Sequence, residues 1–370
     1  MNILHVSAIK SWGGGENHIQ NLVSEMAIIQ PDVVNLILCV KNAKFHNILK
    51  STNLPYKTAA LAHNMDFRYA FKMVKLCRIH EIDIIHIHDP TALTLTIMAD
   101  KLKKLPPFIL SKKTSFSIKN RKRTLYKYNY PKIKRILCVS DKTKEVAGRS
   151  IEDRKKLVRI YHGTNLKTKG TSTDFNLRKK LGLPENIIII GMLANHIRAK
   201  HMETWVNVMD ILVNHQHRKD FYFVQFGEFD KYTNLTLNLI KEKKLESNCS
   251  IFGYHANASN YIPQFNISLL TSQSEGLPQF IYESMYHKTP VISTNVGGIP
   301  EVLENGINGF LTEPHQPEAL AEKIIELATD EKLQKIFSEK SHTKLLKNFT
   351  STKMAEQTFA EYKNIYYGKY

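Results

Sequence analysis

One stretch of the chain decides its fold: Ser274-Glu275-Gly276-Leu277-Pro278-Gln279-Phe280-Ile281-Tyr282-Glu283, followed by Val291-Ile292-Ser293-Thr294-Asn295-Val296-Gly297-Gly298-Ile299-Pro300-Glu301. A glycine and proline turn leads into a helical pattern, and an apolar strand then ends in a second glycine turn. Backbone N–H groups at such a helix start point toward one place, which suits an anion. The carboxylates of Glu275 and Glu283 stand about two helical turns apart. Phosphates and sugar hydroxyls are therefore the expected ligands.

The same alternation of apolar strands and amphipathic helices runs through the whole chain. Apolar runs predict strands at 2–7, 33–40, 83–88, 108–111, 135–140, 187–193, 221–226, 267–271, 291–293 and 309–311. Helical periodicity predicts helices at 16–29, 65–79, 202–213, 277–287, 317–329 and 351–366. Short apolar strands separated by helices are typical of parallel sheets covered on both faces. The expected fold class is α/β, with two doubly wound Rossmann-like domains.

A polar segment without a strand, residues 165–183, divides the chain, and we place a hinge near residue 166. We expect one Rossmann-like domain at residues 1–165 and a second at 166–348. Residues 349–370 are expected to form a helix that packs back on the first domain. Ligands of open α/β sheets bind outside the carboxyl ends of the strands. We therefore expect the two domains to face each other across a cleft that holds the chemistry.

The composition excludes several classes of protein. A hydrophobic content of 42% and a charged content of 23% are typical of globular domains. The sequence has no leader pattern and no run of 18 apolar residues, so we expect neither secretion nor a membrane span. The four cysteines are far apart, without metal-binding or redox spacing, which favours buried thiols in a reducing compartment. The expected location is the cytoplasm.

The net charge of +18 is concentrated in the first half of the chain. Residues 1–165 contain 29 lysines and arginines against 12 acidic residues, whereas residues 166–370 contain 23 against 22. The cations are densest between Lys101 and Arg135, where they mix with Leu, Phe and Tyr. An anionic bilayer attracts such patches, which predicts a peripheral position on the inner face of the cell membrane. A nucleic-acid partner and a solvated basic surface are the alternatives.

Two motifs of the first half follow predicted strands. Gly13-Gly14-Gly15-Glu16 opens a helix, where glycines let the backbone approach a ligand closely; a simple chain reversal is the alternative. The glycines do not have the spacing of a dinucleotide site, which argues against a dehydrogenase. His86 and His88 share one face of a strand, and His88 lies nearest its carboxyl end. We expect His88 to contact a substrate hydroxyl and His86 to be a core residue. A zinc site would need a third ligand, for which the sequence shows no spacing.

The second half offers a cationic loop after its first strand and a pair of glutamates. Arg198 and Lys200 can neutralise a diphosphate from this loop, although surface cations without a ligand are the alternative. Glu275 and Glu283 lie on one loop and one helix, so they suit two acceptors that hold hydroxyls of the same ligand. Glycosidase carboxylates instead flank a bond from opposing sides. The amides of Gly276 and Leu277 are expected to bind phosphate between the two glutamates.

At these residues the chain resembles the retaining glycosyltransferase family four, which has the two-domain GT-B fold. The family's paired glutamates with a Gly-Leu-Pro insert correspond to Glu275–Glu283, and its next glycine motif corresponds to 297–301. Its glycine turn matches residues 13–16, and its His-x-His strand end matches residues 86–88. Residues 162–165, His-Gly-Thr-Asn, loosely match the Asn-Gly-Val-Asp turn of the family. The resemblance covers most of the chain.

The resemblance implies a hexosyltransferase that moves a sugar from a nucleotide-diphosphate sugar with retention at the anomeric carbon. A UDP-sugar is favoured over a GDP-sugar, and the acceptor would be a hydroxyl of a glycan or lipid-linked molecule. Bacterial surface polysaccharide or lipopolysaccharide synthesis is the implied setting. No Asp-x-Asp motif is present to hold a metal, so neither a metal nor a cofactor is expected.

The resemblance also assigns roles to residues. His88, Glu275 and Lys200 are expected to act at the reacting sugar, and Glu283 to bind the ribose. The diphosphate would be held by Lys200 and Arg198, although the family's arginine usually lies nearer the strand end. The other donor-binding residues are expected to be Gly14, Gly15, Gly276 and Leu277.

Two other functions are compatible with parts of the sequence. A GT-B-like sugar-nucleotide epimerase would also bind a nucleotide diphosphate between two such domains, and it would release free sugar without an acceptor. A non-catalytic adaptor for membranes or nucleic acid would use the basic first half. The adaptor leaves the loop with Glu275 and Glu283 unexplained, so we expect no nucleic-acid partner.

Overall fold

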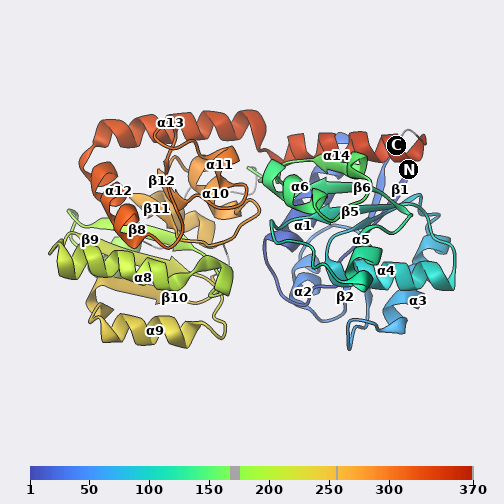
Figure 1. The fold of residues 1–370 in the computed structure, drawn as a ribbon, viewed down its shortest axis with the longest axis horizontal. Coiled ribbons are helices and arrows are strands. Elements are labelled where there is room, and N and C mark those ends of the chain that lie inside the picture. The colour runs from blue at the N-terminus through green and yellow to red at the C-terminus, as the bar shows by residue number, and fades with distance from the viewer. Residues whose placement is uncertain (167–175, 256, 369–370) are drawn as a thin grey trace. The chain divides into compact units, whose positions relative to one another are not determined.

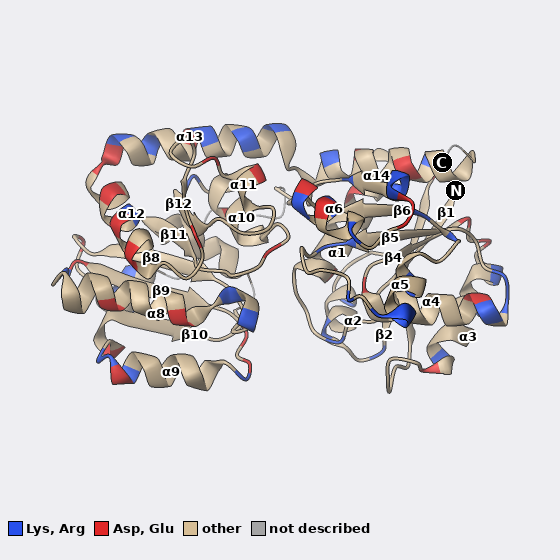
Figure 2. Ribbon diagram, in the orientation of Figure 1, with Lys and Arg blue, Asp and Glu red and all other residues tan. Residues whose placement is uncertain are grey.

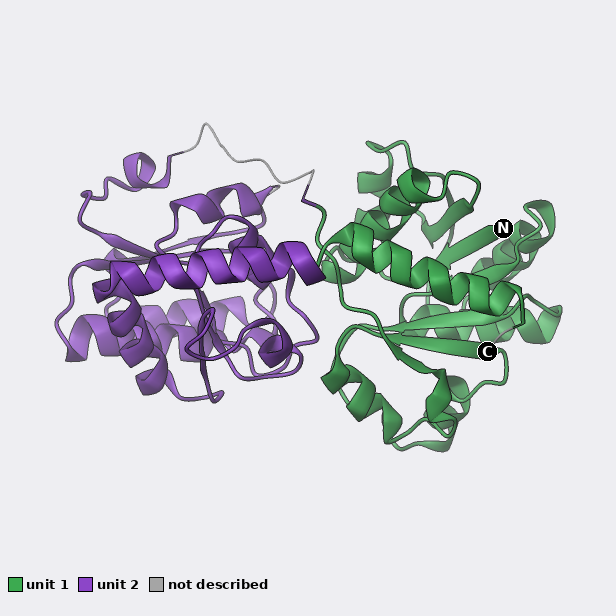
Figure 3. Ribbon diagram, turned by 90° about the horizontal axis from the view of Figure 1, so that it is seen from above, with its two compact units in different colours: residues 1–165, 349–370 green, residues 166–348 purple. Residues whose placement is uncertain are grey.

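A computed structural model describes residues 1–166, 176–255 and 257–368 of the chain. The chain forms two compact units, one made of Met1–Asn165 with Phe349–Tyr370 and the other of Leu166–Asn348 (Figure 1; Figure 3). These are the residues at which the sequence suggests a division. Part of the predicted polar segment, at 167–175, lies outside the described residues.

Unit 1 contains a seven-stranded parallel sheet with the strand order β3-β2-β1-β4-β5-β6-β7. Its strands are β1 (Asn2–Val6), β2 (Val34–Val40), β3 (Tyr56–Ala59), β4 (Ile84–Ile87), β5 (Phe108–Lys112), β6 (Ile133–Cys138) and β7 (Leu157–Arg159). Its helices are α1 (Gly14–Ile29), α2 (Lys44–Leu49), α3 (Phe67–Ile79), α4 (Pro90–Leu102), α5 (Lys122–Tyr128), α6 (Asp141–Gly148) and α14 (Ser351–Tyr366).

Both faces of the unit 1 sheet are buried, because successive side chains of a strand point to opposite faces. Ile3 of β1 packs with residues of α1 and α14, whereas its neighbour Leu4 packs with residues of α3 and α4. The C-terminal helix α14 therefore completes the core of unit 1. Its Tyr362 is fully buried, and the hydroxyl lies 2.6 Å from Nδ1 of His86 on β4.

Unit 2 contains a six-stranded parallel sheet with the order β10-β9-β8-β11-β12-β13. Its strands are β8 (Ile188–Leu193), β9 (Phe221–Phe226), β10 (Cys249–Phe252), β11 (Ile267–Leu270), β12 (Val291–Thr294) and β13 (Phe310–Thr312). Its helices are α7 (Leu177–Leu181), α8 (Met202–Asp210), α9 (Thr233–Glu242), α10 (Gln279–Tyr286), α11 (Ile299–Val302), α12 (Pro317–Thr329) and α13 (Glu331–Asn348).

The two sheets share one topological feature that positions ligands. The strand order reverses direction between β1 and β4 in unit 1 and between β8 and β11 in unit 2. In open α/β sheets, the loops that leave neighbouring strands at such a point diverge and open a crevice at their carboxyl ends. Each unit therefore has one predicted ligand position.

The predicted doubly wound α/β fold is confirmed, with differences at the sheet edges. The strands β3, β7 and β10 were not predicted, and each is short and lies at or next to an edge. Such strands are only partly buried, so they lack the continuous apolar run that marks a central parallel strand. The helix predicted at 202–213 ends as an α-helix at Asp210 and continues as a π-helix, Ile211–His215.

Candidate functional site

The glycine turn of unit 1 opens helix α1 beside the end of β1. A side chain at Gly14 would meet nothing within 4 Å, and one at Gly15 would make only ordinary contact with Lys113. Neither glycine has a positive φ. Packing and backbone conformation therefore do not require glycine at these two positions. The free space at the helix start suits a ligand that approaches the backbone closely.

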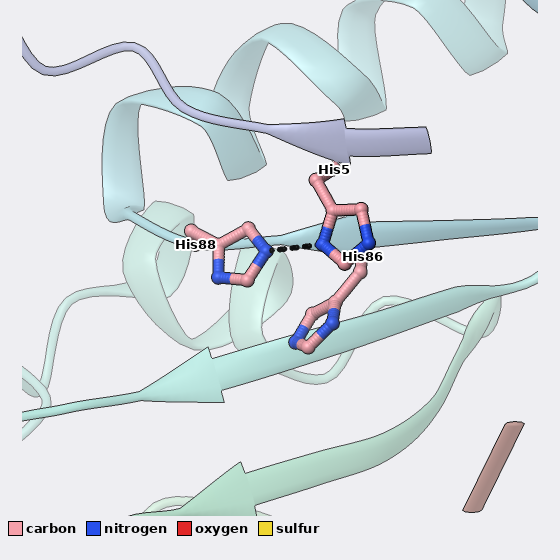
Figure 4. A group of neighbouring side chains, drawn as sticks. All are labelled: His5, His86 and His88. Atoms are coloured by element: carbon pink, nitrogen blue, oxygen red, sulfur yellow. Dashed lines mark hydrogen bonds between the residues drawn. The ribbon is translucent and has the colours of Figure 1, made fainter. Parts of the chain in front are cut away.

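His88 follows β4, and its backbone N–H donates to the carbonyl of Val6 on β1. Its Nε2 lies 3.1 Å from Nδ1 of His5 (Figure 4). Nε2 of His5 in turn lies 3.0 Å from Oδ1 of Asn35 on β2. His5 and His86 are paired in the β1–β4 register, which explains why these rings meet. The predicted substrate-contacting histidine is thus one member of a buried cluster.

Burial controls the protonation of this histidine cluster. Desolvation lowers the pKa of His5 to about 4, and it holds the pKa values of His18, His86 and His88 well below the usual value. The ring of His18 on α1 lies 6.0 Å from that of His88. These imidazoles are therefore neutral at pH 7, and they act as hydrogen-bonding groups rather than as cations.

Three charged residues of the same edge were not singled out as site residues from the sequence. Lys113 directly follows β5, and its ammonium donates to the carbonyl of Gly15 at 2.8 Å. Burial lowers the pKa of Lys113 to about 8, and it raises the pKa values of Glu16 and Asp89. Asp89 also accepts hydrogen bonds from Ala8 and from the first turn of α4. For Lys113 and Asp89 the available signal was their position just after a strand, and for Glu16 it was its place in the glycine motif that opens α1.

The sequence shows no spacing for a third metal ligand beside His86 and His88, but the fold brings a third histidine to them. His5 supplies one, and the ligand atoms of the three side chains lie within 4.8 Å of one another. The third histidine comes from a neighbouring strand 81 residues earlier, so local spacing could not reveal it. Both ring nitrogens of His86 are already hydrogen-bonded, to Tyr362 at 2.6 Å and to Ser111 at 2.8 Å. The contacts describe a hydrogen-bond network.

In unit 2, the loops after β8 and β11 bring Lys200 and Glu275 together. The Lys200 ammonium lies 2.5 Å from Oε1 of Glu275, and their side chains are 16% and 11% exposed. The hydroxyl of Ser272 donates to the same oxygen at 2.6 Å. The backbone N–H of Gln273 donates to the carbonyl of Ala199, which ties the two loops together. Two of the predicted site residues thus form one ion pair.

The turn that follows Glu275 is held by the second glycine turn. Gly276 accepts a hydrogen bond from the N–H of Gly298 at 2.9 Å, and Gly297 adopts a φ of 60° that favours glycine. Gly276 and Leu277 are buried, and helix α10 begins two residues later. Glu283 lies on α10, where its side chain is half-buried. The predicted order of glutamate, turn, helix and glutamate is therefore present.

Arg198 does not join the Lys200 pair in the way that the sequence suggests. Its side chain is exposed, and its backbone carbonyl accepts a hydrogen bond from the side chain of Gln273.

A further polar group, at the start of α10, was not identified from the sequence. The side-chain amide of Gln279 has its oxygen and nitrogen buried without a partner among the described residues. Such a group is a candidate for ligand contact, because burial without a hydrogen bond is costly.

Two family models match the chain and together cover most of it. The model described as Glycosyltransferase Family 4 matches residues 12–168, and the model described as Glycosyl transferases group 1 matches residues 173–344. The chain belongs to glycosyltransferase family four. The predicted family is thereby confirmed.

Relatives in sequence agree with this assignment, and a solved structure shares the fold. The N-acetyl-alpha-D-glucosaminyl L-malate synthase of Bacillus anthracis is 23% identical over 82% of this chain and 79% of that protein. An Escherichia coli UDP-Gal:alpha-D-GlcNAc-diphosphoundecaprenol alpha-1,3-galactosyltransferase is 22% identical over 88% and 87%. The Anabaena protein HepE in complex with UDP-glucose has a TM-score of 0.86 at 19% identity, over 98% and 100% of the two chains. The GT-B fold is therefore shared.

Within the described residues, none of this glycosyltransferase's helices is long and apolar enough to cross a bilayer.

Proposed function

We propose that this glycosyltransferase moves a sugar from a nucleotide-diphosphate sugar to a hydroxyl of a glycan or lipid-linked acceptor, with retention and without a metal. The observation that carries the proposal is the Lys200–Glu275 pair at the β8/β11 switch point. The cation pairs with Glu275, in the turn that leads into α10, and a cation together with a helix start suits the binding of a diphosphate. The sequence motif alone could not establish that proximity.

In the proposed reaction, Lys200 and the amides at the α10 start stabilise the departing diphosphate. The bond between the anomeric carbon and the phosphate oxygen breaks, and the acceptor oxygen bonds to that carbon on the same face. The acceptor proton passes to the leaving phosphate, so no protein nucleophile is needed. The contribution of the protein is charge stabilisation and alignment. Glu283 binds the ribose, Glu275 the transferred sugar, and His88 a sugar hydroxyl.

The exposed Arg198 has a smaller role in this proposal than Lys200, because ion pairing already places the lysine beside Glu275. Gly14 and Gly15 supply the unobstructed helix start of unit 1 for a phosphate of the donor or for the acceptor. We favour a UDP-sugar as donor. The names of the galactosyltransferase relative and of the HepE complex support this choice. The diphosphoundecaprenol acceptor of the former supports a lipid-linked acceptor and a role in surface polysaccharide synthesis.

Peripheral binding to an anionic membrane belongs to the same proposal. The large side chains Met65, just before α3, and Phe67 and Phe71, in its first two turns, are 56%, 54% and 58% exposed. Lys75 and Arg78 continue the exposed line of the helix toward its C-terminus. Figure 2 shows further Lys and Arg residues on α3 and α5. Apolar side chains beside cations suit a surface of anionic lipid.

Thermal unfolding with nucleotide sugars tests the donor assignment most directly. A ligand at 100 times its Kd adds about 2.7 kcal/mol of stability to the folded state. We expect UDP and at least one UDP-sugar to raise Tm, and the Lys200→Ala variant to lose the shift. A protein that no nucleoside diphosphate stabilises would contradict the proposed donor class.

A further inference from the structure

A chain of hydrogen bonds ends at His88, which follows β4 at the β1/β4 point of unit 1. It links Asn35 on β2, His5 on β1 and His88 after β4, at distances of 3.0 and 3.1 Å. All three residues are at least 95% buried, so these contacts are shielded from water. Because each ring nitrogen of a neutral histidine is either donor or acceptor, the direction of every bond in this chain matters.

The direction is set at Asn35. Its side-chain Nδ2 donates to the backbone carbonyl of Val33 at 3.0 Å, which leaves Oδ1 facing His5. The opposite amide orientation would place two oxygens against each other. A carbonyl oxygen can only accept a hydrogen bond, so Nε2 of His5 must carry the proton. Burial lowers the pKa of His5 to about 4, so at neutral pH its other nitrogen, Nδ1, has a lone pair.

The same reasoning applies to the next bond. Since Nδ1 of His5 accepts, Nε2 of His88 must donate and carry the His88 proton (Figure 4). Nδ1 of His88 then has a lone pair, and it is buried without a hydrogen-bond partner among the described residues. An acceptor in this position carries a desolvation cost until a donor reaches it.

We propose that Asn35 and His5 are positioning residues that hold His88 as its Nε2–H tautomer, so that Nδ1 accepts a hydrogen bond from a hydroxyl of the bound sugar. The identity of that ligand rests on the proposed function, whereas the tautomer does not. The relay makes this position selective for a hydroxyl over a carbonyl or carboxylate oxygen, since two acceptors repel each other. His86 stands outside the relay, because its nitrogens bond to Ser111 and Tyr362.

Nuclear magnetic resonance of the ligand-free protein labelled with ¹⁵N-histidine tests the tautomer. We expect a nitrogen–nitrogen coupling across the bond between His88 and His5, with the proton attached to Nε2 of His88. The Ser111→Ala variant, which changes only the partner of His86, should keep this signal. His5→Phe should remove it, and His88→Gln identifies the resonance. A proton on Nδ1 of His88 or on Nδ1 of His5 would overturn the relay.

Binding of UDP-glucose and UDP, used as probes, tests the role of the accepting nitrogen. In Asn35→Leu and His5→Phe we expect UDP affinity within about twofold of wild type. The advantage of UDP-glucose over UDP should fall by about fivefold to tenfold, as for one lost hydrogen bond. An unchanged advantage in both variants would overturn the ligand contact. If the wild-type protein binds neither probe, the proposed donor is wrong, while the resonance experiment still decides the tautomer.

Discussion

The two units place their candidate residues at the same topological point but in different electrostatic settings. At the β1/β4 point, burial favours the neutral form of each titratable group. It lowers the pKa values of His88 and Lys113, and it raises the pKa of Asp89. At the β8/β11 point, Lys200 and Glu275 form an ion pair 2.5 Å long. One fold thus supports two kinds of site.

The difference teaches that strand order gives the position of a site and that side chains give its chemistry. Neutral imidazoles suit the recognition of hydroxyls, where direction of hydrogen bonding matters. An ion pair suits a ligand whose own charge changes during the reaction, because the cation can exchange a carboxylate for a phosphate. If this division is correct, substitutions in the two units should fail in different ways.

The largest expected effect is on turnover in unit 2. Lys200→Ala and Glu275→Gln should each lower kcat about 100-fold to 1000-fold, because in the proposed reaction each group acts at the reacting sugar or diphosphate. Assays of sugar transfer, or of donor hydrolysis, measure this loss. Lys288→Ala is the matched control, since it breaks an exposed ion pair with Glu339 in the same unit and should leave kcat unchanged. Equal effects in all three variants would contradict the assigned roles.

Substitutions at two glycines, Gly227 after β9 and Gly14 at the start of α1, distinguish a role in packing from a role in ligand binding. A side chain at Gly227 in unit 2 would lie 1.8 Å from the backbone oxygen of Ala194, so Gly227→Ala should cost about 2–3 kcal/mol or more of unfolding free energy. Gly14→Ala meets nothing within 4 Å and should leave Tm within about 2 °C, while it lowers activity by obstructing the helix start. Denaturant unfolding and turnover distinguish these outcomes; a destabilised Gly14→Ala protein would assign that glycine to packing.

Acid should destabilise unit 1 through its buried histidines. The folded pKa of His5, about 4, lies below the ordinary value of 6.5, so between these values only the unfolded chain binds the proton. Stability is therefore full above pH 6.5 and falls as the pH drops toward 4. From pH 7.5 to 5.5 we expect a loss of about 1 kcal/mol for His5, with further losses from His18, His86 and His88. Hydrogen exchange resolved by unit should show the larger loss in unit 1; equal losses would argue against it.

Much of the fold could be predicted because central parallel strands are strongly patterned. The segments that form β1, β4, β8 and β9 are mostly apolar on both faces of the strand. The predicted ends of β9 and α12 are the ends that the structure shows. The loop from Glu275 to Glu283 could also be predicted, because its turn, helix and carboxylates are local in sequence. Edge strands such as β3 carry polar residues toward solvent, so their pattern resembles that of a loop.

The rest of the candidate site depends on contacts between distant parts of the chain. His5 meets His88 only because β1 and β4 are neighbours in the sheet, and Tyr362 reaches His86 from 276 residues away. The spacing of these residues in the sequence does not predict either contact. Lys113 shows the same limit, since its carbonyl partner Gly15 lies 98 residues earlier. Strand order, once known, would have identified the pairing of His5 with His88, whereas the other two contacts depend on how helices α14 and α1 pack on the sheet.

The smallest expected effect concerns the membrane, and it extends the comparison to the surfaces of the two units. Phe67→Ser with Phe71→Ser should weaken binding to vesicles of anionic lipid about fivefold to tenfold, because the two rings together contribute about 1 kcal/mol if roughly a quarter of each ring surface inserts. Leu235→Ser is the matched control, since this side chain on α9 is 65% exposed in the unit without excess charge. Vesicle sedimentation at two salt concentrations separates the electrostatic from the apolar contribution to binding. Salt screens the charges of the lysines and arginines, whereas it leaves the apolar contribution in place. Binding that does not depend on anionic lipid, or that falls equally in the Leu235 variant, would contradict a membrane-binding surface on unit 1.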